Sequence, residues 1–347
     1  MAAALLSACG GGGGGSSPNA DAGTLQNADT EVASRPTVDG QTLDGTLSYK
    51  GSQTSVYQLN LGTGQTLETY NENTSAIDEE ERRAALRFSV DATGQARVIY
   101  RDHGVGPQGM RIWAKRYSGP SGQTWQSLFD VSGNHFIDNK SIISPDNRHL
   151  MLLWQADAES PITLRIVNTQ GEVVNEWGEP AQFTWLPDGR ALILDTDLSI
   201  WVTSADFATV QSLGRLSDTG TIRYFTPSPD GQRVAWVGPD NKVRASKLDG
   251  SAALLVADVR EASLPVRELT WSPDGKAVAF NHPKAANLPG YGWTGGCEAI
   301  WVVPSTMTTV IDTYANDTRH MLIGPDGRFL CVGESVVSGV FVFLDWH

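Results

Sequence analysis

The sequence predicts an all-β fold built from repeated four-stranded antiparallel sheets, and three observations support this prediction. A short turn phrase recurs along the 347 residues at a spacing of about 40 residues. A run of apolar residues without polar alternation follows each copy, as is typical of strands buried on both faces. Helical periodicity is nearly absent.

The repeated phrase is a Pro-Asp pair followed by Gly or Asn, found at residues 144–147, 186–189, 228–231, 272–275 and 324–327. Its aspartates are separated by 42, 42, 44 and 52 residues, and a degenerate copy at Asp91 lies 55 residues before the first. Proline sets φ, aspartate bonds the neighbouring backbone, and glycine accepts positive φ, so the phrase predicts a tight turn. A metal or acid/base site needs convergent groups, so we expect a structural role for these aspartates, Asp146, Asp188, Asp230, Asp274 and Asp326.

The strands around each turn complete the repeating unit. Three consecutive apolar residues follow each turn, at residues 150–152, 192–194, 234–236, 278–280 and 330–332. A mostly apolar strand enters the turn, and two further strands follow after a variable loop. Four short strands in about 40 residues, covered on both faces by neighbouring sheets, describe the blades of a β-propeller.

The stretch from Trp271 to Phe280, Trp-Ser-Pro-Asp-Gly-Lys-Ala-Val-Ala-Phe, resembles the repeat of the TolB-like (WD-like) β-propeller family. The resemblance spans about residues 84–347 and is specific for the fold, because the pattern recurs. It implies periplasmic protein partners engaged through a rim or the central channel. It does not define an activity, because unrelated proteins use the same blade.

Blade number follows from counting repeats. Six copies run from about residue 84 to the end, and residues 45–69 read as three strands of one further blade, so seven blades fit best. We expect a strand near residues 37–43 to close the ring, because the last repeat stops after a third strand at 340–344. Six blades are the alternative.

The N-terminal residues have a different composition. Leu6-Ser7-Ala8-Cys9 resembles the lipobox of bacterial lipoproteins, in which the cysteine is lipidated, and a run of glycines follows it. We therefore divide the chain into a signal remnant (1–9), a Gly/Ser-rich tether (10–35) and the propeller (36–347). The alternative is a disordered tail with an accidental cysteine. The first interpretation predicts a lipid-anchored protein of the bacterial envelope, in the periplasm and attached to the outer membrane.

Composition argues against two classes of function, nucleic-acid binding and the binding of a metal or another cofactor. The 26 Lys and Arg against 39 Asp and Glu leave a net charge of −13, which disfavours a nucleic-acid partner. The 3 Cys and 6 His do not fall at metal-ligand spacings, so we expect neither a metal nor another cofactor.

Candidate binding residues lie in the longest predicted rim loop, residues 282–297, which contains His282, Tyr291 and Trp293. The loop is interpreted as an aromatic contact patch for a partner or, alternatively, as a cover over Trp301. Cys297 and Cys331 could form a disulfide between adjacent blades, or Cys331 could be a small free core residue.

Two functions remain open from the sequence. The first is a monomeric, non-catalytic scaffold that binds envelope proteins or a cell-surface ligand. The second is a glycan lyase or hydrolase with acidic residues in the central channel. The predicted innermost strands contain Phe-Thr-Trp, Phe-Thr-Pro and Leu-Thr-Trp without inward acids, which favours the first.

Overall fold

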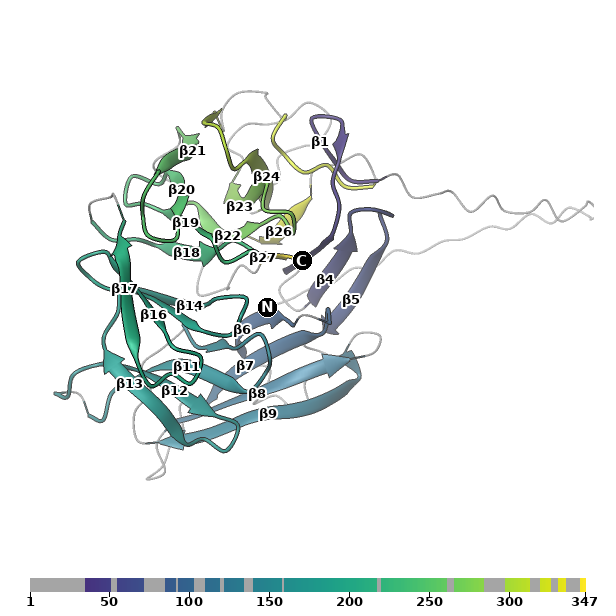
Figure 1. Ribbon diagram of the computed structural model, residues 1–347. Helices are drawn as coiled ribbons and strands as arrows, with labels where there is room; N and C mark the ends of the chain where they lie inside the picture. Colours follow the sequence, from purple (N-terminus) through teal and green to yellow (C-terminus); the bar gives the residue numbers. More distant parts are fainter. Residues whose placement is uncertain are drawn as a thin grey trace, which may run out of the picture. The chain divides into compact units, whose positions relative to one another are not determined.

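The chain forms a β-propeller of six blades, seen as a ring of sheets in the computed structural model (Figure 1). The structure describes a set of segments that together cover most of the propeller: residues 35–50, 55–71, 85–91, 93–102, 110–118, 122–133, 140–157, 159–216, 220–260, 265–283, 297–312, 319–325, 330–334 and 344–347. All regular structure in these segments is β-strand.

Blade 1 joins the two ends of the propeller in one sheet, in the order β27 (Leu344–Trp346), β3 (Thr46–Lys50), β4 (Ser55–Asn60) and β5 (Thr66–Asn71). Blades 2 and 3 are each continuous in sequence. They contain β6 (Ala85–Val90), β7 (Ala96–Asp102), β8 (Met110–Ser118) and β9 (Thr124–Gly133), then β10 (Ile142–Ile143), β11 (His149–Trp154), β12 (Thr163–Asn168) and β13 (Val173–Gly178).

Blade 4 is also continuous, whereas blades 5 and 6 each take a strand from later in the chain. Blade 4 contains β14 (Gln182–Trp185), β15 (Ala191–Leu194), β16 (Ser199–Thr203) and β17 (Val210–Arg215). Blade 5 contains β18 (Tyr224–Pro227), β19 (Arg233–Val237), β20 (Val243–Lys247), β21 (Leu254–Val259) and the parallel edge strand β25 (Thr309–Ile311). Blade 6 contains β22 (Arg267–Trp271), β23 (Ala277–Pro283), β24 (Cys297–Pro304) and β26 (Cys331–Glu334).

The hydrophobic core consists of separate clusters between neighbouring blades, which explains the apolar runs. In β11, Leu150 and Leu152 pack toward blade 2, whereas Met151 and Leu153 pack toward blade 4. Similarly, in β19 Trp236 packs toward blade 4 and Ala235 toward blade 6. Because both faces of each strand meet another blade, polar alternation would bury unpaired polar groups. The predicted all-β propeller of four-stranded antiparallel blades is confirmed.

The preferred number of seven blades is wrong, and the alternative of six is confirmed. The last repeat does not build a sheet of its own, because β26 pairs with β24 and completes blade 6. The final strand then crosses to blade 1, where Leu344 pairs with Tyr49 and Trp346 with Leu47. A phrase count overestimates blades when the last copy supplies strands to two existing sheets.

The predicted closing strand near residues 37–43 is also wrong. These residues form a separate hairpin of β1 (Thr37–Val38) and β2 (Gln41–Thr42), whose Thr37 exchanges two backbone hydrogen bonds with Ile323. The ring is instead closed by β27 against β3, where Thr46 and His347 exchange hydrogen bonds of 2.6 and 3.0 Å. The C-terminal strand is further held in this place because Trp346 donates from its indole Nε1 to the Asp44 carbonyl, at 2.9 Å.

The four Pro-Asp turns that the structure describes share a hydrogen bond from the amide two residues after the aspartate to its carboxylate. At Asp274, the carboxylate accepts the Ser272 hydroxyl at 2.8 Å and the Lys276 amide at 3.0 Å. These bonds, led by the one from the Lys276 amide, lower the pKa of Asp274 to about 2, although partial burial acts in the opposite direction. Positive φ values at the fourth residue of the phrase, 63° for Asn147 and 68° for Gly275, show why Gly or Asn stands there.

The closing sheet generates a stability prediction at Gly45, whose φ is +98°. A Cβ added there would lie 2.9 Å from the His347 carbonyl oxygen, Pro273 and the Trp346 indole. We expect Gly45→Ala to lower the unfolding free energy by about 2–4 kcal/mol, because backbone strain and overpacking add. Urea titration measures this. Gly40→Ala is the matched control, because Gly40 has a φ of +72° but nothing within 4 Å. Equal losses in the two variants would contradict the role of Gly45 in closure.

Candidate functional site

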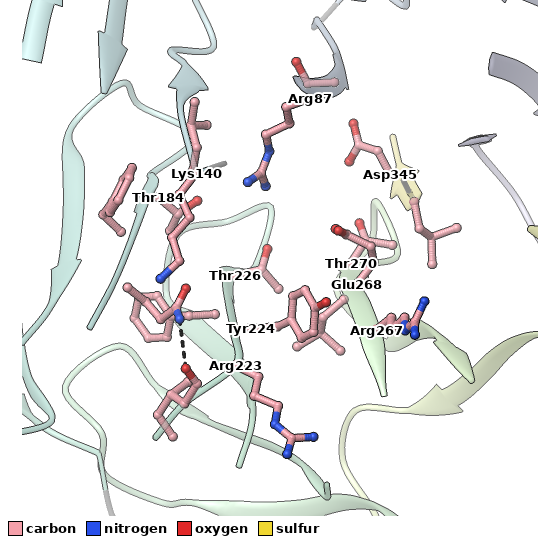
Figure 2. Close-up of a pocket in the computed structure, with 18 of the residues that line it drawn as sticks. Arg87, Lys140, Thr184, Arg223, Tyr224, Thr226, Arg267, Glu268, Thr270 and Asp345 are labelled. Atoms are coloured by element: carbon pink, nitrogen blue, oxygen red, sulfur yellow. Dashed lines mark hydrogen bonds between the residues drawn. The ribbon is translucent and has the colours of Figure 1, made fainter. Parts of the chain in front are cut away.

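The main candidate site is the central channel, a cavity of about 780 Å³ at which the innermost strands of all six blades converge. Figure 2 shows side chains from these strands surrounding the cavity. Since each innermost strand belongs to a different blade, a ligand in the channel would contact groups held by six separate sheets. A cavity of this volume is in the range that accommodates small organic ligands.

One ring of channel residues lies, in blades 2 to 6, four positions before the aspartate of the turn that follows the innermost strand. It consists of Arg87, Ile142, Thr184, Thr226 and Thr270, and Asp345 of β27 lines the channel in the remaining blade. The next residue along the strand packs between blades. There, Trp185 and Trp271 donate their indole N–H groups to the carbonyls of Ile142 and Thr226 in the preceding blade, at 2.9 and 3.2 Å. These bonds hold neighbouring inner strands in register.

Three basic residues mark one mouth of the channel. Lys140 and Arg223 lie just before β10 and β18, and Arg267 is the first residue of β22. The innermost strands of blades 2 to 6 run in the same direction, because each leads into a turn on the same rim. The three residues therefore share the mouth opposite the Pro-Asp turns, where Lys140 also donates from Nζ to the Ala181 carbonyl at 3.3 Å.

Two acidic residues also line the channel, so the expectation of innermost strands without acids is wrong. Glu268 has a φ of 45° and occupies a register shift between Arg267 and Leu269, a bulge that redirects its side chain relative to a regular strand. Asp345 is half-buried. Burial raises the pKa of Asp345, and the electrostatic interactions with His347 and Arg97 oppose this shift without cancelling it.

The channel has the opposite charge balance to the chain as a whole. Among the residues the structure describes, five basic side chains line it (Arg87, Arg97, Lys140, Arg223 and Arg267) against two acidic ones. The chain carries a net charge of −13. A concave site lined mainly by one sign of charge concentrates ligands of the opposite sign.

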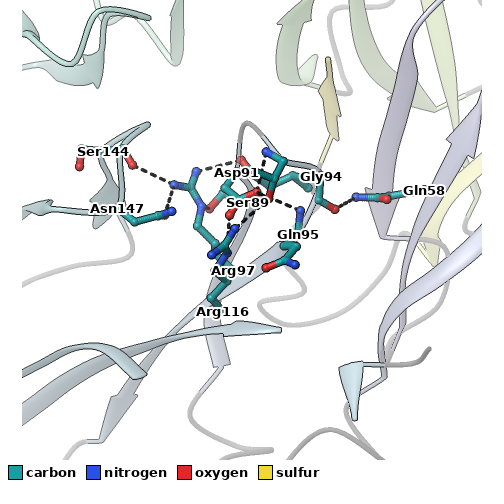
Figure 3. Close-up of polar contacts among 11 residues, drawn as sticks. Gln58, Ser89, Asp91, Gly94, Gln95, Arg97, Arg116, Ser144 and Asn147 are labelled. Carbon is teal, nitrogen blue, oxygen red and sulfur yellow. Dashed lines mark hydrogen bonds and ion pairs between the residues drawn. The ribbon is translucent and has the colours of Figure 1, made fainter. Parts of the chain in front are cut away.

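The guanidinium of Arg97 has a structural role. It lies at the centre of a hydrogen-bond network that joins three blades (Figure 3). Its guanidinium donates to the Ser144 carbonyl and the Asn147 side chain of blade 3, at 2.9 and 3.0 Å. It also donates to the Val90 carbonyl at 2.9 Å. On the other side, Gln58 of blade 1 donates to the Gly94 carbonyl. Burial lowers the pKa of Arg97 to about 10, so the group remains protonated at neutral pH.

Asp91 anchors the same network from the degenerate turn. Its carboxylate accepts the Thr93 and Gln95 amides at 2.8 and 3.0 Å and forms an ion pair with Arg116 at 2.5 Å. Burial favours the neutral acid, but the hydrogen bonds and the Arg116 charge prevail and lower the pKa of Asp91. The turn at Asp91 lacks the Pro-Asp-Gly phrase, and a network of charged residues stabilises it instead. This network consists of Asp91, Arg97 and Arg116, and we call it the latch.

None of the predicted site residues that the structure describes lines this channel. Cys9, Tyr291, Trp293 and Asp326 lie outside the described residues. His282 is buried in β23, where its carbonyl accepts the Trp301 indole N–H at 3.1 Å. The other four turn aspartates lie in the turns between first and second strands, as shown by the bonds to Arg148, Arg190, Gln232 and Lys276.

Cys297 and Cys331 lie on neighbouring strands of blade 6 and not in two adjacent blades. The register pairs Cys297 with Glu334 and Cys331 with Ala299. A disulfide between them stays a prediction.

Two further features concern the described part of the chain only. No group of three or more His, Cys, Asp or Glu side chains is placed to hold a metal ion there. Those segments also contain no helix with the length and apolar character needed to cross a bilayer.

The latch generates a second stability prediction. Arg97→Gln should lower the unfolding free energy by about 3–5 kcal/mol, because it leaves the Ser144 and Val90 carbonyls without their charged donor in a buried region. Urea titration with Arg148→Gln as control measures this, because the Arg148 side chain is 79% exposed. A loss no larger than that of the control would show that the latch is not needed.

Comparison with known proteins identifies no family. No protein-family model matches the sequence, and no curated protein matches it. Among solved structures, a Bacteroides uniformis protein named as a candidate 6-phosphogluconolactonase is 14% identical, with a TM-score of 0.45 over 75% of this chain and 78% of that chain. The Niastella koreensis GH74 enzyme is 11% identical, with a TM-score of 0.47 over 78% and 46% of the two chains. Kuenenia stuttgartiensis hydrazine synthase is 18% identical, with a TM-score of 0.43 over 68% and 67%. At these identities the likeness concerns the fold alone.

Proposed function

We propose that this chain is a ligand-binding β-propeller that receives a small molecule in its central channel. The observation that carries the proposal is the cavity of about 780 Å³ lined by charged and hydroxyl side chains from the innermost strands. A rigid ring of sheets holds these groups in place before the ligand arrives, which reduces the entropy lost on binding. Binding without catalysis is the leading form of the proposal.

Its cellular context rests on the N-terminal sequence. The lipobox-like residues ending at Cys9, and the glycines after them, support a TolB-like lipoprotein tethered in the bacterial envelope. The tether would leave the propeller free to meet envelope proteins or a cell-surface ligand. We expect mass spectrometry of the native protein to find a lipid-modified Cys9 as the first residue. An unmodified Cys9 would contradict the anchor without affecting the channel proposal.

A second candidate function is a propeller enzyme acting on glycans. It is favoured by one observation, the presence of Glu268 and Asp345 in the channel. Two carboxyl groups are the usual requirement for glycoside hydrolysis, and a raised pKa suits a general acid such as Asp345. Product formation from a glycan panel, lost in both Asp345→Asn and Glu268→Gln, would favour this function.

The channel proposal is tested by blocking the cavity. Thr226→Trp places a bulky side chain in the channel, whereas Thr209→Trp places the same side chain at an exposed position outside it. We expect compounds from a metabolite panel that raise the Tm of the wild type and the Thr209 variant to leave the Tm of the Thr226 variant unchanged. Circular dichroism and the Tm without compound establish that both variants fold.

Equal stabilisation of both tryptophan variants would place binding outside the channel. Thr184→Trp, which fills the cavity from blade 4, repeats the test if Thr226→Trp is unstable.

A further inference from the structure

We infer that the channel ligand is a sugar-sized organic anion carrying a carboxylate or phosphate group together with hydroxyl groups. This inference rests on the proposed function and names the ligand class. Three features of the channel support it: the positions of the basic residues, the partners of their charged groups, and the threonine hydroxyl groups.

The basic residues come from different blades and surround the ligand path. Lys140, Arg223 and Arg267 of blades 3, 5 and 6 lie at one mouth, and Arg87 of blade 2 lies further along the channel. Figure 2 shows the Arg87 side chain extending from its strand toward the middle of the cavity. An anion entering by this mouth meets positive charge on several sides.

In two of these arginines, the guanidinium group makes no polar contact with other described residues. The guanidinium groups of Arg87 and Arg223 form no hydrogen bond or ion pair with any residue in the described segments, in contrast to Arg97, which makes four hydrogen bonds. Arg87 occupies the ring position that is threonine in three other blades. Like charges facing one cavity repel each other, so an anion that neutralises them would stabilise the site.

The type of anion follows from the donors. A guanidinium presents paired N–H groups that match the oxygens of carboxylate or phosphate, so two arginines favour these groups over a halide. Thr184 and Thr226 lie in the same ring as Arg87 and offer hydroxyls that can both donate and accept hydrogen bonds. Glu268 and Asp345 add acceptors, which suit the hydroxyl donors of a sugar. The combination fits an acidic saccharide better than an apolar acid.

The test compares acidic sugars with their neutral counterparts on the full chain by isothermal titration calorimetry. Digalacturonate is matched with galactobiose, and glucose 6-phosphate with glucose, so that the two pairs distinguish a carboxylate from a phosphate ligand. We expect at least one acidic sugar to bind at least about tenfold more tightly than its neutral counterpart, and to weaken as salt is raised. Equal affinities within both pairs, or no binding by either acidic sugar at millimolar concentration, would overturn the inference.

Removal of the arginine charges tests whether the acidic sugar binds in the channel. The double variant Arg87→Gln with Arg223→Gln should weaken the acidic sugar by at least about tenfold. Arg148→Gln with Lys276→Gln is the matched control, because it removes the same charge from side chains that are 79% and 83% exposed on the turn rim. Equal weakening by the two doubles would mean that only net charge matters, and would overturn the assignment to the channel.

The outcome is separable from that of the proposed function. Neutral compounds that bind wild type but not Thr226→Trp, with no preference for acidic sugars, would retain a ligand-binding channel and reject the anionic class.

Discussion

The pairing of β27 with β3 is the constraint on which the rest of this propeller depends. Each blade buries both faces against its neighbours, so an open ring would leave two apolar sheet faces in water. The final strand and the first strand of blade 1 remove both free faces at once. The close contacts of Gly45 with His347, Pro273 and Trp346 show how little room this closure leaves.

Closure of the ring also forms the channel. The innermost strands meet around one axis only when six blades complete the ring, and the cations of blades 2, 3, 5 and 6 then face a common space. Bonds between blades, such as that from the Trp271 indole to the Thr226 carbonyl, keep these strands from shifting relative to each other. The scaffold can therefore hold like charges together, because their repulsion is small beside the burial energy of the interblade clusters.

Much of the fold could be predicted, since turn chemistry is local. The Pro-Asp-Gly phrase specifies a reversal by its own φ preferences and hydrogen bonds, and the apolar runs after it specify strands covered on both sides. The blade number could not be counted in the same way. Cys331 follows a proper turn phrase, yet its strand joins blade 6, because pairing with β24 satisfies its backbone without a new sheet.

The channel residues could not be predicted for a related reason. The sequence favoured the long loop around Tyr291 and Trp293, and its Phe-Thr and Leu-Thr pairs suggested neutral innermost strands. A signal was present: Arg87 lies four residues before its turn aspartate, where threonine lies in three other blades, and Arg223 and Arg267 both lie seven residues before theirs.

The sequence by itself determined the all-β blades, their turns and the acidic composition, because these follow from interactions between residues close along the chain. Only the tertiary structure decided that there are six blades, which strand closes the ring, and which charges share the channel. Those features depend on pairing between residues as far apart in sequence as Asp44 and Trp346. Local propensity carries no information on such pairs, whose choice follows from which arrangement leaves no sheet face or backbone group unpaired.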